Sequence, residues 1–126
     1  MSNQLWTSDA MNDADPTTLL RAAESMIVAR RALQTSLPVD FLHDPALDIL
    51  LALFVTPAEG PAATTEAIIA ATTIPPGVAQ RWIGVLAQEG LVIADGTIAL
   101  TASGRARVTD AIKAVIRSQA DLHAGN

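Results

Sequence analysis

A chain of 126 residues has the size of one ordinary domain, because two separate cores in that length would each be near the limit of stability. Half of the residues are hydrophobic but only 3% are aromatic, so we expect a core of Ala, Leu, Ile and Val. The absence of cysteine excludes disulfides, thiolate zinc sites and cysteine nucleophiles, and it agrees with a reducing, cytoplasmic location. The net charge of -5 counts against nucleic-acid binding unless the basic residues gather on one face.

The N-terminal segment, residues 1–15, carries Asp9, Asp13 and Asp15 but no basic residue and no long apolar run, so it is unlike a secretory signal. We predict a flexible lead there. The longest apolar stretch elsewhere, residues 49–55, is far too short for a membrane span, which predicts a soluble protein.

Two Asp-Pro pairs, Asp15-Pro16 and Asp44-Pro45, predict where the first two helices begin. In each pair a capping carboxylate precedes a proline whose missing N–H costs nothing at the first helical position. The first helix should run to about residue 35, and its main apolar stripe consists of Leu19, Ala22, Met26, Ala29 and Leu33. The second, residues 45–55, is apolar on nearly every side and should be buried all round.

A helix-turn-helix is expected next. Thr64 or Thr65 caps a short helix that ends near residue 72, and a tight connection follows over residues 73–75. The next helix should run to about residue 89, where Gly90 ends it in a left-handed conformation.

A minimal β-hairpin and a last helix complete the chain. Residues 91–94 and 97–100 are β-prone and flank Asp95-Gly96, a strong two-residue hairpin signal. Thr101 can cap the last helix, which we expect to reach about residue 122 and to leave residues 123–126 frayed.

The segments TEAIIAATTIPPGVAQRWIGVLAQEG and LVIADGTIALTASGR, in which Leu100-Thr101 precede Gly104, resemble winged-helix domains of the MarR (multiple-antibiotic-resistance regulator) type. The similarity covers residues 45–118. It implies a mainly α fold with a small β-hairpin, a winged helix-turn-helix over residues 16–122, and a DNA-binding transcriptional regulator that forms a homodimer through its first and last helices.

In a helix-turn-helix, the second helix enters the major groove with its outward face. At about 100° per residue, the residues predicted to face inward are Val78, Trp82, Val85 and Leu86, with Trp82 assigned to the core. Those predicted to face outward, toward DNA, are Gly77, Gln80, Arg81, Gly84 and Gln88.

Arg81 and Gln80 are the candidates for base contacts, because Arg bridges the acceptors of guanine and Gln pairs with adenine. The alternative is that both merely solvate an exposed face. Gly77 and Gly84 weaken the helix, so we hypothesise that DNA or a partner helix approaches the backbone closely there.

The predicted wing departs from the MarR pattern. Wings of that type usually carry arginine for the minor groove, whereas residues 91–100 contain no cation and include Asp95. The candidates for contacts with the DNA backbone are Thr64, Thr65, Arg105 and Arg107. Two roles stay open for Arg30 and Arg31 of the first helix: they flank a phosphate path, or they pair with acidic residues such as Asp40 or Asp44.

The expected dimer interface is apolar. It comprises Ile27 and Val28, which lie outside the main stripe of the first helix, and Val108, Ile112, Val115, Ile116 and Leu122 of the last helix. Such a dimer would place two recognition helices about 34 Å apart on a palindrome.

No catalysis, metal or cofactor is expected. His43 and His123 are the two histidines and lack helical i, i+4 pairing, and the sequence contains no nucleophile elbow and no phosphate-binding loop. Two functions stay open. The leading one is a dimeric DNA-binding regulator, and the alternative is a winged-helix module that has lost DNA binding and binds protein, as the acidic charge and the cation-free wing suggest. The sequence does not indicate an effector ligand.

Overall fold

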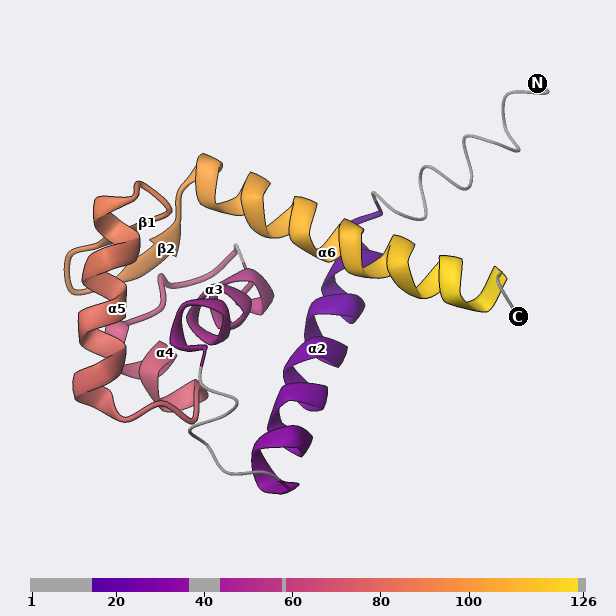
Figure 1. The fold of residues 1–126 in the computed structure, drawn as a ribbon. Coiled ribbons are helices and arrows are strands. Elements are labelled where there is room, and N and C mark those ends of the chain that lie inside the picture. Colours follow the sequence, from indigo (N-terminus) through magenta and orange to yellow (C-terminus); the bar gives the residue numbers. More distant parts are fainter. Residues whose placement is uncertain (1–14, 37–43, 58, 125–126) are drawn as a thin grey trace.

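The structure is a computed structural model that describes residues 15–36, 44–57 and 59–124 (Figure 1). Residues 1–14 of the lead predicted for residues 1–15 lie outside the described residues, as do Asp40 and His43. The elements in chain order are α2 Pro16–Ser36, α3 Pro45–Val55, α4 Thr65–Ala71, α5 Pro76–Gln88, β1 Val92–Ala94, β2 Ile98–Leu100 and α6 Ala102–Ala124. This order confirms the mainly helical fold with a small β-hairpin, although α6 continues to Ala124 instead of ending near residue 122.

Helix α3 occupies the middle of the molecule. Figure 1 shows α4 and α5 on one side of it and α2 on the other, with α6 crossing above α2 and α3. The Asp44 carboxylate caps α3 by accepting a hydrogen bond from the Leu47 amide at 3.1 Å, as the Asp-Pro pair predicts. Ile49 and Leu51 on α3 are completely buried, so the apolar surface of this helix is covered on more than one side.

Two apolar clusters pack against α3. The first lies under the helix-turn-helix and the hairpin, and its buried members are Ile49, Ala52, Leu53, Ile68, Ile69, Ile74, Ala79, Ile83, Leu86, Val92 and Ile98. The second joins α3 to the outer helices and consists of Leu19, Ala23, Leu51, Phe54, Val108 and Ile112. Val108 and Ile112, which the sequence suggested for a dimer interface, are therefore core residues of the protomer, because α2 and α3 cover the first turns of α6.

The helix-turn-helix is built as the sequence predicts. The Thr64 hydroxyl oxygen accepts from the Ala67 amide at the start of α4, and residues 72–75 connect α4 to α5. In this connection the Thr72 side chain donates to the Ile69 carbonyl at 2.8 Å, and Ile74 is buried. Gly90 adopts a φ of 77°, and the Leu91 amide donates to the Leu86 carbonyl, so the left-handed end predicted after α5 is confirmed.

The hairpin differs from the prediction at its turn. Ala94 pairs with Ile98, so the loop has three residues, Asp95, Gly96 and Thr97, instead of the two predicted. The reason is that Thr97 forms a separate antiparallel bridge to Thr64. The Ile98 amide also donates to the Ala63 carbonyl at 2.9 Å, which fastens the wing to the start of the helix-turn-helix.

A tight junction joins the end of α5, the wing and α6. The Leu91 carbonyl accepts from the Thr101 amide at 3.0 Å, and the Thr101 hydroxyl donates to the Gly90 carbonyl at 2.6 Å. The same Thr101 oxygen caps α6 by accepting from the Gly104 amide at 2.9 Å. Gly104 is buried, and a Cβ at this position would lie 2.0 Å from the Leu91 carbonyl oxygen. We call this contact, formed by Gly90, Leu91, Thr101 and Gly104, the Gly104 junction.

None of the helices in the described ranges combines the length and the apolar character that crossing a membrane requires.

Gly104→Ala is expected to destabilise the fold by about 1–3 kcal/mol or more, because the new methyl group overlaps backbone atoms that cannot move without breaking the Thr101–Leu91 hydrogen bond. Urea unfolding followed by circular dichroism measures this loss. Gly77→Ala is the matched control, since a Cβ there meets nothing within 4 Å. Equal stability of Gly104→Ala and the parent protein would show that α6 does not begin this close to Leu91.

Candidate nucleic-acid interface

The outward face of α5 is exposed as predicted. Gly77, Gln80, Arg81, Gly84 and Gln88 are all solvent-accessible. The opposite face is anchored by Ala79, Ile83 and Leu86, which are buried in the first cluster. Val78 and Trp82 are half-buried and pack against the same cluster, so Trp82 faces inward as expected but lies at the edge of the core.

Val85 was predicted to face inward, and this prediction is wrong. Its side chain is 41% exposed, whereas Leu86 beside it is 4% exposed. The buried stripe follows Ala79, Ile83 and Leu86, which is turned by about one residue from the predicted stripe. Val85 consequently lies at the edge of the outward face, and only the packing of α5 on its neighbours reveals this.

Arg81 is the one cation between residues 61 and 100, a segment that also contains Glu66, Glu89 and Asp95. Among the described residues, its guanidinium forms no ion pair or hydrogen bond. All five guanidinium donors of Arg81 are therefore available to an external acceptor such as guanine or phosphate.

Gly77 and Gly84 leave the backbone of α5 open on this face. A Cβ added at either position meets nothing within 4 Å, so the fold itself does not require glycine there. Both residues lie in a helix, where glycine costs about 0.5–1 kcal/mol relative to alanine. The close approach of an external molecule to the backbone at these glycines stays a prediction.

The residues considered for contacts with the DNA backbone are not gathered at α5. Thr64 and Thr65 lie at the start of α4, where the Thr64 side chain caps the helix and the Thr65 amide donates to the Gly96 carbonyl. The Arg105 guanidinium lies 5.0 Å from the ring centroid of Phe54, so it stacks on the end of α3. Arg107 is exposed and borders an apolar groove between α2, α3 and α6.

The wing is acidic at its tip. Asp95 is exposed, and the Thr97 hydroxyl donates to its carboxylate at 3.3 Å. The outward position of β1 is taken by Ile93, which is 60% exposed. The tip therefore presents an anion to solvent, which would repel the phosphates that border a minor groove.

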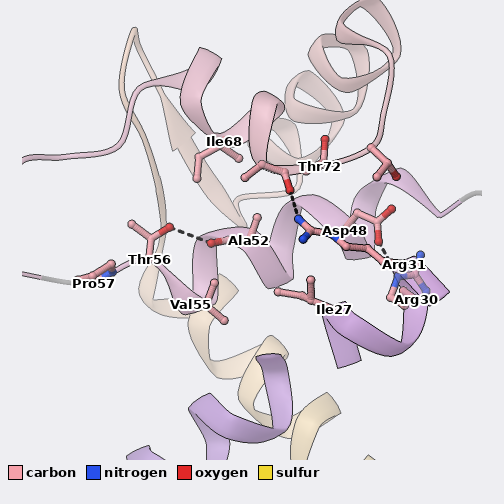
Figure 2. A pocket seen from close by; sticks show the side chains of 12 residues that line it. Ile27, Arg30, Arg31, Asp48, Ala52, Val55, Thr56, Pro57, Ile68 and Thr72 are labelled. Carbon is pink, nitrogen blue, oxygen red and sulfur yellow. Dashed lines mark hydrogen bonds and ion pairs between the residues drawn. The ribbon is translucent and has the colours of Figure 1, made fainter. Parts of the chain in front are cut away.

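A cavity of about 410 Å³ lies where α2, α3 and α4 meet (Figure 2). Arg30 borders it and pairs with Asp48 at 2.5 Å, not with the Asp44 carboxylate considered from the sequence, and its guanidinium also donates to the Asp44 carbonyl at 3.4 Å. Arg31 donates to the Ala71 carbonyl at 2.7 Å. Arg30 thus joins α2 to the first turn of α3, and Arg31 joins α2 to the end of α4, the first helix of the helix-turn-helix.

Apart from Val108 and Ile112, which lie in the core, the described side chains suggested for a dimer interface divide into two groups. Ile27 and Ile116 are half-buried against the second cluster, so they serve the protomer in part. Val28 is 65% exposed and Val115 is half-buried, so both leave apolar surface accessible on α2 and α6. Leu122 belongs to α6, but its side chain lies outside the described residues.

Within the described ranges, no three His, Asp or Glu side chains group closely enough to hold a metal ion. The fold, with its exposed helix-turn-helix and hairpin, defines a winged-helix protein. Compared with protein-family models, the chain matches no family, and a comparison with curated proteins finds no significant match.

Gly84→Ala is expected to stabilise the fold by about 0.5–1 kcal/mol and, at the same time, to weaken duplex binding, because the methyl group fills the space through which DNA would reach the backbone. Urea unfolding and fluorescence anisotropy with a labelled duplex measure the two effects. Ser25→Ala, an exposed helix position on α2, is the control for stabilisation without a change at α5. An affinity that Gly84→Ala leaves unchanged would contradict close approach at this site.

Proposed function

We propose that the protein is a dimeric, MarR-like DNA-binding transcriptional regulator that reads a palindromic site with α5. The observation that carries this proposal is the outward face of α5, where Arg81 and Gln80 stand unobstructed on a helix whose other face is packed into the core. A helix of this kind fits the major groove, in which arginine and glutamine distinguish guanine and adenine. The proposal includes a cytoplasmic location, with which the absence of cysteine agrees.

The scarcity of cations shapes how such binding would work. With one arginine on the helix-turn-helix and an acidic wing, a single protomer would release few counterions and bind any duplex weakly. Two protomers on one palindrome would double every base contact, so specificity would come from α5 and from symmetry. A protein-binding winged helix is the second candidate, favoured by the acidic tip of the wing.

Fluorescence anisotropy with genomic fragments over a salt series tests the proposal. Saturable, salt-sensitive binding that resists competitor DNA supports the regulator. Its absence from every fragment would favour the protein-binding candidate.

Arg81→Ala is expected to weaken binding to the cognate site by about 1–3 kcal/mol and to leave the fold intact, because the side chain is exposed and has no partner among the described residues. Arg21→Ala, an exposed arginine on α2, removes the same charge and is the matched control. Equal losses in the two variants would reduce Arg81 to a general electrostatic role.

The dimer is inferred from surface that one protomer does not cover. Helix α6 has 23 residues and would be about 34 Å long, and Figure 1 shows its second half extending beyond α2. Val115 lies on this half, and Val28 is exposed on the neighbouring α2. A two-fold arrangement would let α2 and α6 pack on their copies.

Val28→Asp is expected to dissociate the dimer, because it places a charge in an apolar interface while the protomer fold leaves this side chain 65% exposed. Light scattering coupled to size exclusion should give twice the protomer mass of 13.1 kDa for the parent protein and the single mass for the variant. Ala62→Asp, at an exposed loop position, adds the same charge elsewhere and should stay dimeric. A parent protein of single mass would contradict the dimer.

A further inference from the structure

The outward face of α5 includes an aliphatic side chain that neither the core nor a polar role explains. The large hydrophobic side chains exposed among the described residues are Leu20, Val28, Val85 and Ile93. Leu20 and Val28 belong to α2 and Ile93 to the wing, so Val85 alone of this set shares a helix with Arg81.

Val85 and Arg81 are neighbours on the surface of α5. Residues four apart lie one above the other on a helix, with Cβ atoms about 5–6 Å apart. Gly84, beside Val85, has no side chain, and the space where its Cβ would stand is open. Valine in a helix keeps one χ1 rotamer, so its two methyl groups hold a fixed position and lose little entropy on contact.

Major-groove chemistry offers one apolar feature of comparable size. Guanine presents two acceptors that suit arginine, and thymine presents its C5-methyl group. Successive base pairs lie about 3.4 Å apart along the duplex, so side chains one helical turn apart on α5 can reach neighbouring base pairs. No other base edge in the groove offers an aliphatic surface.

We propose that Val85 contacts the C5-methyl group of a pyrimidine next to the guanine that Arg81 binds. This inference rests on the proposed DNA-binding function and specifies which two adjacent bases of the half-site α5 contacts. Thymine and 5-methylcytosine carry the same methyl group at the same place, so either base meets the requirement.

The test uses a short fluorescent duplex containing the fragment selected by the anisotropy titration. Each thymine of the half-site is replaced in turn by deoxyuridine, which removes the methyl group alone. At the position found, cytosine and 5-methylcytosine are then compared. Separately, each guanine is replaced in turn by 7-deazaguanine, which removes the N7 acceptor. The guanine bound by Arg81 is the one whose replacement weakens binding of the parent protein but not of Arg81→Ala.

The parent protein is expected to bind the methylated base of each pair about three- to five-fold more tightly than the unmethylated one, the effect of burying one methyl group. A preference for thymine over deoxyuridine identifies thymine as the natural base, and a larger preference for 5-methylcytosine over cytosine identifies a methylated site. Val85→Ala should abolish both preferences. Leu20→Ala removes an aliphatic side chain that is 37% exposed on α2 and should keep them.

Binding that ignores the methyl group at every position would overturn the inference while leaving the proposed function intact. The inference also fails if Val85→Ala keeps the full preference, or if the methyl-sensitive base is not adjacent to the Arg81-dependent guanine. Failure to bind any fragment would instead overturn the proposed function, and this inference with it. Circular dichroism of Val85→Ala confirms that the variant is folded before binding is compared.

Discussion

Helix α3 must be covered on several sides at once, and the rest of the fold follows from this constraint. Its sequence, PALDILLALFV, leaves few positions that tolerate water. On one side of α3, Ile49 and Leu53 pack against the helix-turn-helix and the hairpin. On the other side, Leu51 and Phe54 pack against α2 and α6. A helix with one apolar stripe would need a single partner layer, whereas α3 requires two. Helix α5 is therefore held by the same element that holds the outer helices.

Local chemistry in the sequence predicts most of the fold. The Asp44-Pro45 pair, Thr64 and Thr101 locate helix starts because each cap acts within four residues, and the structure contains all three capping bonds. Gly90 marks the end of α5 because a left-handed helix end is also a local feature, one that favours glycine. The errors concern contacts between distant segments. The turn of the hairpin lengthens because Thr97 pairs with Thr64, a bond that no short window of sequence contains.

In the candidate site, too, local features could be predicted from the sequence and contacts between distant segments could not. The exposure of Gln80 and Arg81 follows from helical periodicity, but the edge position of Val85 depends on how α5 is rotated on α3. Val108 and Ile112 belong to a stripe whose pattern cannot say whether its partner is the same chain or a copy. Arg30 pairs with Asp48 and not with the Asp44 carboxylate, which is nearer in sequence, because the α2–α3 packing brings the Arg30 and Asp48 side chains together. The periodicity of the sequence thus predicts which face of a helix is apolar, but only the packed structure shows what that face contacts.

The Gly104 junction also has a mechanical meaning. Because Thr101 is hydrogen-bonded to both Gly90 and Leu91, the end of α5, the base of the wing and the first turn of α6 are joined directly to one another. In a dimer held through α6, a small change in the angle at which the two α6 helices cross would then change the distance between the two α5 helices. In such a dimer the distance between the two α5 helices would be set by how the α6 helices cross, not by the loops beside α5.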